Sequence, residues 1–204
     1  MKISSSNAAS SRTEKHRMIR TITGLGILTA LVVVFQYLGS FIRFGPFSVS
    51  LVLIPIVIGA ALYKPWAGAW LGLIFSVMVF VTQDANAFLA INIPGTIITV
   101  TVKGTVAGLV AGLVYHWLSK KNEWLATFAA AAVCPIVNTG IFLIGCRLFF
   151  FDTVSAWSLE NGFENVFLYM IVGFVGFNFL FELLFNLIFS PTVVRLVKMF
   201  REKE

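Results

Sequence analysis

The sequence predicts an all-α, polytopic membrane protein: a single bundle of six transmembrane helices with both termini in the cytoplasm. Hydrophobic residues make up 58% of its 204 residues and charged residues 12%, and the mean hydropathy is +0.91. Soluble domains average about 45–50% apolar and about 25% charged residues. The apolar residues also gather in six runs, each near the length of about 20 residues that a spanning helix needs. This pattern argues against a soluble enzyme, a disordered chain, a collagen and a coiled coil.

The first apolar run, residues 18–40, follows a polar, serine-rich segment that ends in a basic cluster. A basic segment before an apolar run is also typical of a signal peptide. This run is longer than a signal core, however, and no small-residue cleavage site follows it. We therefore expect a retained helix, preceded by a disordered cytoplasmic tail over residues 1–17.

The second and third runs, residues 47–63 and 66–82, are separated by the sequence YKPW at 63–66. Proline is typical of a tight turn, and the two aromatic residues suit the membrane–water interface. The fourth run, residues 94–118, begins at Pro94. A first helical turn tolerates proline because its missing N–H would have no partner there.

The fifth and sixth runs cover residues 124–150 and 165–193. Together the six runs form one transmembrane domain over residues 18–198, followed by a second cytoplasmic tail over residues 199–204. The connections on the side opposite the termini carry more of the loop residues than the connections on the same side. This distribution suits a protein that handles something arriving from outside the cell.

Lysine and arginine lie mainly on one side of the expected membrane. With six spans, twelve of the fifteen basic residues fall on the side of the termini, and the opposite connections hold Arg43 and Arg147. Basic residues collect on the cytoplasmic side of membrane proteins, so we expect both termini in the cytoplasm. The net charge of +6 is then explained by the membrane topology and does not indicate a nucleic-acid partner.

Lys103 is one of two charged residues that lie away from the ends of the apolar runs, where a charge costs about 2.5–3.5 kcal/mol even on the insertion scale. It ends a polar series that shares one helix face, since the spacings are four, three and four residues. The other members are Asn92, Thr96 and Thr99. A polar series that runs inward from the outer surface predicts the wall of an outward-facing pocket, with Lys103 in contact with the ligand.

Glu182 is the second ionisable residue in the apolar runs, and Asn178 lies one helical turn before it. Asn138 and Thr139 place further polar groups midway along the fifth run, and we expect Asn138 and Asn178 to bind the substrate. Three interpretations stay open for the two charged residues. In the first, Lys103 and Glu182 form a structural ion pair. In the second, Lys103 anchors a ligand while Glu182 serves elsewhere. In the third, Glu182 takes part in a proton relay.

The sequence has no motif of a P-loop NTPase, a zinc protease, an α/β-hydrolase or a zinc deaminase, and it has no CxxC pair. Outside the polar series, the apolar runs hold almost no acids, bases or metal ligands. We therefore expect no enzyme, no cofactor and no metal site. The chain cannot hydrolyse ATP by itself.

The small-residue pair Gly26 and Ala30 occurs together with a basic lead-in, six expected helices and the stretch SLVLIPIVIGAALYKPWAGAWLGLIFSV at 50–77. In this combination the chain resembles the substrate-binding (S) component of energy-coupling factor (ECF) vitamin transporters. The resemblance covers residues 18–198. The family usually has alanine at both positions of the pair, whereas glycine stands at the first position here.

The resemblance implies a vitamin pocket near the outer surface of a bacterial plasma membrane, closed by the outer connections. Arg43 and the outer halves of the last three helices would contribute to it. Trp157 and Tyr169 would cover the ligand, although aromatic residues near an interface also serve as lipid anchors. The resemblance further implies that Gly26 and Ala30 dock on a membrane scaffold (T) subunit, which carries two cytoplasmic ATPase subunits.

The few cations near the expected pocket favour an anionic vitamin, because a charge-assisted hydrogen bond is about twice as strong as a neutral one. Pantothenate or a folate therefore fits better than the cation thiamine. Pantothenate is the best single expectation, supported by an overall likeness to the pantothenate branch. Two other functions stay open: a standalone proton-coupled transporter that uses Glu182, which would usually show internal repeats, and an assembly protein without a substrate.

Overall fold

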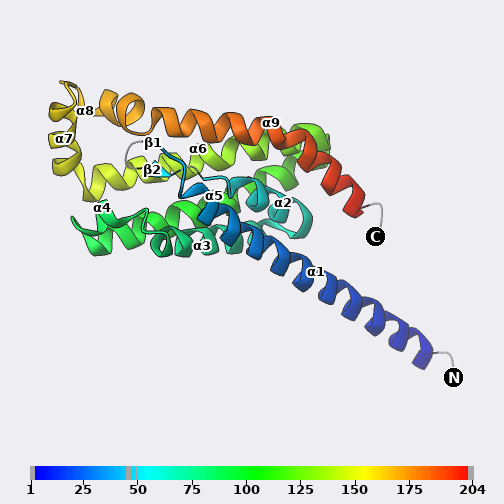
Figure 1. Ribbon diagram of the computed structural model, residues 1–204. Coiled ribbons are helices and arrows are strands. Elements are labelled where there is room, and N and C mark those ends of the chain that lie inside the picture. Colours follow the sequence, from blue (N-terminus) through cyan, green and yellow to red (C-terminus); the bar gives the residue numbers. More distant parts are fainter. Residues whose placement is uncertain (1–2, 45–46, 49, 202–204) are drawn as a thin grey trace.

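Helices make up nearly all of the described chain (Figure 1). The computed structural model describes residues 3–44, 47–48 and 50–201, except for the side chains of residues 3–13, 16–17, 43–44, 47 and 201. The elements in chain order are α1 (Ile3–Gly39), β1 (Arg43–Phe44), β2 (Phe47–Ser48), α2 (Leu53–Tyr63), α3 (Pro65–Val81), α4 (Asn86–Leu89), α5 (Ile93–Ser119), α6 (Glu123–Phe149), α7 (Phe151–Glu160), α8 (Val166–Leu168), the π-helix η1 (Tyr169–Phe174) and α9 (Gly176–Arg201). The two strands form a short antiparallel hairpin. The expected all-α class is therefore confirmed over the described residues.

Four helices of the described chain are long and apolar enough to cross a membrane. They are the segments Met18–Gly39, Ile93–Leu118, Glu123–Phe149 and Gly176–Phe200. The helices α2 and α3 are also apolar but shorter, with 11 and 17 residues. Each of the six predicted apolar runs therefore contains an apolar helix, and four of these helices have the length of a full span.

The second predicted run begins with the hairpin and not with a helix. We expected a helix over residues 47–63, but α2 begins at Leu53 and residues 47–48 form β2. Pro55 fits this later start. In the first turn of α2 its missing N–H removes no helical hydrogen bond, whereas deeper in the helix it would break one. The hairpin and the residues after it reach into the bundle near the site described below.

Three other helix bounds differ from the expected ones. The backbone of α1 is helical from Ile3, where we expected a disordered tail over residues 1–17. Extending an established helix is easier than nucleating one, because each added residue gains a hydrogen bond. The sixth run, expected as one helix over residues 165–193, is divided into α8, η1 and α9, and α9 continues to Arg201. The π-helical turn of η1 is a feature that is often found at functional sites.

Asparagine side chains start the two central helices. The Oδ1 atom of Asn92 accepts a hydrogen bond of 2.9 Å from the backbone N–H of Gly95, and Asn122 caps α6 in the same way. Such caps satisfy N–H groups that have no partner in the first helical turn. Between α2 and α3, Lys64 adopts a φ of 131° and Pro65 occupies the first position of α3. The chain therefore reverses there without a longer loop.

Helices α3 and α5 pack backbone against backbone through glycine. A Cβ atom on Gly108 would overlap the carbonyl oxygen of Gly68, and a Cβ atom on Gly72 would overlap the carbonyl oxygen of Gly104. Small residues let helices approach this closely in a membrane. These glycines therefore serve the close packing of α3 against α5.

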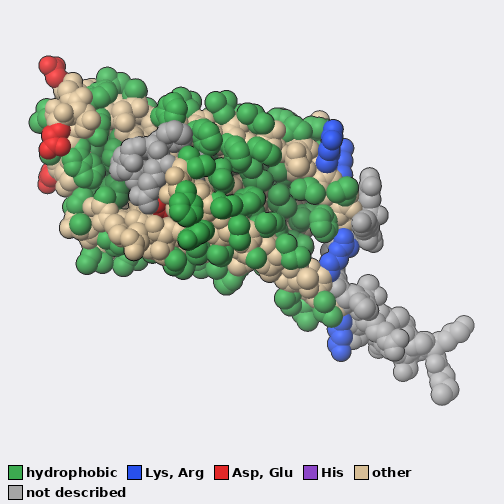
Figure 2. Space-filling model, viewed as in Figure 1, with side chains coloured by type: hydrophobic (Ala, Val, Ile, Leu, Met, Phe, Trp, Pro, Cys, Tyr) green, Lys and Arg blue, Asp and Glu red, His purple; other side chains and the backbone are tan. Residues whose placement is uncertain are grey.

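Charged side chains gather at the two ends of the bundle. The N-terminal half of α1 projects from the end at which α9 also finishes, so both termini lie toward the same end (Figure 1). Lysine and arginine side chains gather at that end, and acidic side chains gather at the opposite end, where α7 and α8 lie (Figure 2). The visible face between them is mostly hydrophobic, as in proteins that face lipid.

Candidate functional site

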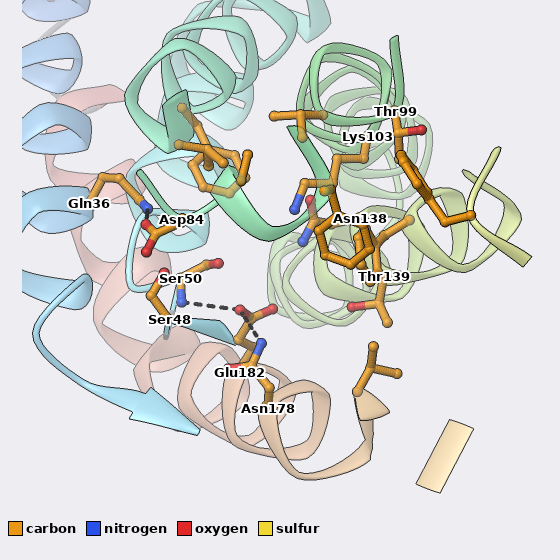
Figure 3. Close-up of a pocket in the computed structure, with 18 residues that line it drawn as sticks. Gln36, Ser48, Ser50, Asp84, Thr99, Lys103, Asn138, Thr139, Asn178 and Glu182 are labelled. Atoms are coloured by element: carbon orange, nitrogen blue, oxygen red, sulfur yellow. Dashed lines mark hydrogen bonds between the residues drawn. The ribbon is translucent and has the colours of Figure 1, made fainter. Parts of the chain in front are cut away.

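A polar cavity lies inside the bundle, among α1, α3, α5, α6 and α9 (Figure 3). Its volume is about 60 Å³. The polar side chains that line it are Gln36, Ser48, Ser50, Asp84, Thr99, Lys103, Asn138, Thr139, Asn178 and Glu182. Burying this many polar groups in an apolar bundle costs free energy unless they find partners. The cavity is therefore the strongest candidate for a functional site in the described chain.

Lys103 reaches from α5 into this cavity and lies near two aromatic rings. Its Nζ atom is 5.7 Å from the ring centroid of Phe75 and 5.3 Å from that of Phe142. Aromatic faces attract a cation at these distances, by about 0.5–2 kcal/mol. Among the described residues, none accepts a hydrogen bond from this ammonium group. Its N–H donors are therefore available to a ligand in the cavity.

Glu182 contributes a carboxylate from α9 and is 2% exposed. Its Oε1 atom accepts a hydrogen bond of 3.1 Å from the backbone N–H of Ser50 and one of 3.0 Å from Nδ2 of Asn178 (Figure 3). Its Oε2 atom is buried and has no hydrogen-bond partner among the described residues. The carboxylate thus links the segment before α2 to α9 through Oε1, while Oε2 is left without a hydrogen bond from the described residues.

Lys103 and Glu182 line the same cavity without a direct bond between them. Both hydrogen bonds that Glu182 accepts come from other residues, and its second oxygen accepts none from the described chain. The two charges attract each other through space. The arrangement therefore places an ammonium and a carboxylate where a single ligand can contact both, and it lacks the geometry of a closed ion pair.

Gln36 and Asp84 form a second polar contact at the cavity. Gln36 is 1% exposed, and its Nε2 atom donates a hydrogen bond of 2.9 Å to Oδ2 of Asp84 (Figure 3). The hydroxyl group of Thr82 lies 2.6 Å from the same carboxylate oxygen. The Oε1 atom of Gln36 is buried without a hydrogen-bond partner in the described chain. This contact links α1 to the connection that follows α3.

Aromatic side chains form another wall of the cavity. The ring of Phe88, in the short helix α4, packs edge-on against Phe142 at 5.4 Å and Phe150 at 5.0 Å between ring centroids. All three residues line the cavity. Trp157 in α7 packs behind them, with its ring 6.0 Å from that of Phe88. The site therefore combines charged and amide groups with an apolar surface, as ligand pockets usually do.

Four of the residues predicted to bind a substrate line the cavity together: Thr99, Lys103, Asn138 and Asn178. They come from three helices, α5, α6 and α9, and the helical periodicity of each run brings its polar face inward. Thr99 and Asn138 each have a buried oxygen without a hydrogen-bond partner in the described chain. The predicted polar faces thus converge on one space.

The other predicted residues lie elsewhere. Asn92 caps α5, and the hydroxyl group of Thr96 donates a hydrogen bond of 2.7 Å to the carbonyl oxygen of Asn92. Short polar side chains near a helix start often bond the local backbone in this way. Trp157 and Tyr169 belong to the aromatic cluster and do not line the cavity. Arg43 begins β1, and its side chain lies outside the described residues.

Four polar residues of the cavity are not among those expected from the sequence: Gln36, Ser48, Ser50 and Asp84. Gln36 offers a usable signal, because it is a single amide within an otherwise apolar part of the first run. Asp84 and the two serines lie in connections, and their approach to the cavity depends on how those connections fold. Among the described residues, no three histidine, cysteine or acidic side chains gather in a way that would hold a metal ion.

Apolar helices around a buried polar cavity are typical of a multi-pass membrane protein. A family model described as the substrate-specific component of ECF transporters matches residues 20–194. The chain belongs to this family, whose members are transport subunits and not enzymes. No curated protein and no solved structure matches the chain.

Proposed function

We propose that this chain captures a vitamin from outside the cell and presents it for ATP-driven uptake, as the S component of an ECF-type ABC importer. The cavity around Lys103 and Glu182 carries the proposal. Buried polar groups without partners are costly, and a polar ligand would supply the missing partners. Membership of the substrate-specific ECF family supports the same conclusion.

The proposed topology has six membrane spans and cytoplasmic termini in a bacterial plasma membrane. The gathering of lysine and arginine at the end that holds the termini supports it (Figure 2), since these residues collect on the cytoplasmic side. The helix α2 is short, but most of its residues are buried against the rest of the bundle. At 1.5 Å per residue α2 covers about half of the hydrocarbon core, so the rest of this span would come from the residues before it, within the protein and away from lipid. The cavity would then lie in the outer half of the membrane.

Pantothenate is the best single candidate for the substrate, and a folate is the next. Lys103 favours a ligand with a carboxylate, because a charge-assisted hydrogen bond is stronger than a neutral one. The cavity volume of about 60 Å³ is well below the volume of about 300–1,000 Å³ that is typical of small-molecule pockets. Binding would therefore require the aromatic wall around Phe88 to move outward.

Gly26 and Ala30 are the proposed contact with the scaffold subunit, on which two ATPase subunits assemble. Both residues are exposed on α1, and a Cβ atom on Gly26 would meet nothing within 4 Å. Small residues allow close approach of a partner helix. This face of α1 is therefore open to a partner, whereas the glycines of α3 and α5 are used inside the bundle.

A standalone proton-coupled transporter is the second candidate function. The buried Oε2 atom of Glu182, which has no hydrogen-bond partner in the described chain, favours it because such an oxygen is available to take up a proton. In this mechanism, protonation of Oε2 would neutralise Glu182 and weaken the contacts that Oε1 accepts from Ser50 and Asn178. The segment before α2 would then move as the proton crosses.

Native mass spectrometry of the purified chain, followed by reconstitution in liposomes, tests the proposal. A vitamin that co-purifies with the chain would identify the substrate. Uptake of this vitamin should require the scaffold subunit, both ATPases and ATP. Uptake by this chain alone, driven by a proton gradient, would contradict the ECF mechanism and support the second candidate.

A further inference from the structure

Two carboxylate–amide pairs line the cavity. In the first, Nε2 of Gln36 donates a hydrogen bond of 2.9 Å to Asp84. In the second, Nδ2 of Asn178 donates a hydrogen bond of 3.0 Å to Glu182. A carboxylate oxygen accepts hydrogen bonds, whereas an amide has one donating and one accepting end. Each carboxylate therefore turns the NH₂ group of its amide toward itself and turns the amide oxygen away.

The two amide oxygens that are turned away, and the second oxygen of Glu182, have no hydrogen-bond partner within the part of the chain that the structure describes. The atoms Gln36 Oε1, Asn178 Oδ1 and Glu182 Oε2 are buried and accept no hydrogen bond from the described residues. All three residues line the same cavity. Buried polar atoms are nearly always hydrogen-bonded in folded proteins. These three acceptors, together with the unpaired Oδ1 atom of Asn138 in the same cavity, therefore indicate that a ligand brings the donors.

On the α5 side of the cavity, across from Gln36 and Asp84, Lys103 provides hydrogen-bond donors instead of acceptors (Figure 3). An ammonium group has three donors and no acceptor. A ligand that satisfies both sides needs an acceptor or an anionic group near Lys103 and N–H or O–H donors elsewhere. An anion with a purely apolar remainder would satisfy Lys103 and leave the three oxygens unpaired.

We propose that Gln36 and Asn178 are specificity-determining residues that select a substrate with at least two N–H or O–H donors, in addition to the group that contacts Lys103. The proposal rests on the proposed function, since it takes the cavity as the site of the transported solute. Asp84 acts as a positioning residue for the Gln36 amide. Glu182 positions the Asn178 amide and also offers its own free oxygen.

The first test compares two ligands that differ in their donors. Pantothenate carries two hydroxyl groups that N-(3,3-dimethylbutanoyl)-β-alanine lacks, while the carboxylate, the amide and the carbon skeleton are the same. Isothermal titration calorimetry on the purified full-length chain should show the analogue binding about 100-fold more weakly, from about tenfold for each lost hydrogen bond. Equal affinities would overturn the proposal, and this comparison does not depend on any variant folding correctly.

The second test removes the acceptors from the protein. Gln36→Met and Asn178→Leu should each weaken pantothenate binding about tenfold and leave binding of the analogue nearly unchanged. The matched controls Gln83→Met and Asn186→Leu replace amides that do not line the cavity, so both affinities should stay at the wild-type level. Variants that weaken both ligands equally, or neither of them, would overturn the proposal.

The experiments can contradict this inference without contradicting the proposed function. If pantothenate does not bind, folate, riboflavin, biotin and thiamine are titrated in turn, and the vitamin that binds replaces pantothenate in the comparison of variants with controls. Unchanged affinity in Gln36→Met and Asn178→Leu overturns the inference while the proposed function stands. If none of the five vitamins binds, both are overturned.

Discussion

The backbone N–H of Ser50 donates a hydrogen bond of 3.1 Å to Oε1 of Glu182, across a separation of 132 residues. This bond ties the segment between β2 and α2 to the N-terminal part of α9, and Asn178 donates to the same oxygen. Glu182 is 2% exposed, so bulk water does not compete for these bonds. One carboxylate therefore joins the packing of two distant segments to the wall of the cavity.

Glu182→Leu should destabilise the chain more than Glu182→Gln. Leucine leaves the donors of Ser50 and Asn178 without an acceptor, at about 1–3 kcal/mol for each buried donor, whereas a glutamine oxygen can still accept from both. Thermal unfolding of the purified variants in detergent, followed by tryptophan fluorescence, measures the difference. If the two variants unfold at the same temperature, the bonds to Ser50 and Asn178 contribute nothing to stability.

Lys103→Met should weaken binding of pantothenate about 10- to 100-fold, since a hydrogen bond to a charged group contributes about 1.5–3 kcal/mol. Methionine keeps most of the side-chain length near Phe75 and Phe142 and removes the ammonium group. Calorimetric titration measures the affinity, and thermal unfolding of the same preparation measures stability.

The control for this prediction is Lys121→Met, which removes an exposed lysine after α5 and should leave affinity unchanged. The two interpretations of Lys103 give different patterns. A ligand contact predicts lost affinity with retained stability. Unchanged affinity together with lower stability would support a structural interaction with Glu182 and would contradict the role in binding.

Helical periodicity explains how much of the site the sequence could predict. Thr99 and Lys103 lie one turn apart in α5, so their common face follows from spacing alone. Asn178 follows from the same argument in α9. Part of each predicted polar face lines the cavity, because an apolar bundle has few other places for a polar side chain.

The remaining residues depend on tertiary structure that spacing does not determine. In the sequence, Asp84 looks like an ordinary charged residue of a loop. It reaches the cavity because the connection after α3 folds so that Asp84 contacts Gln36. Asn92 and Thr96 share the predicted face of α5, but they lie in its first turn, where bonds to the local backbone compete with a ligand. Their position away from the cavity thus follows from the helix start and not from the helical period.

Gly108→Ala should destabilise the chain by about 1–3 kcal/mol, as overpacking of a well-packed interior does. Its Cβ atom would overlap the carbonyl oxygen of Gly68, and backbone atoms cannot move away as a flexible side chain can. The control is Gly140→Ala, because a Cβ atom there would meet nothing within 4 Å. Alanine at that helical position should be neutral or stabilising by up to about 1 kcal/mol. Equal unfolding temperatures for the two variants would show that the α3–α5 contact tolerates an added methyl group.

Gly26→Leu should leave vitamin binding intact and prevent assembly with the scaffold subunit. The substituted position faces open space in this chain, so the added side chain disturbs no internal contact, but it blocks the close approach that a partner helix needs. Gly140→Leu is the matched control, since it adds the same side chain at another open glycine, on α6. Co-purification of each variant with co-expressed scaffold and ATPase subunits measures assembly, and calorimetry measures binding. If Gly26→Leu assembles normally, the docking surface does not lie on this face of α1. If neither variant assembles, the added bulk has a general effect that is not specific to this face.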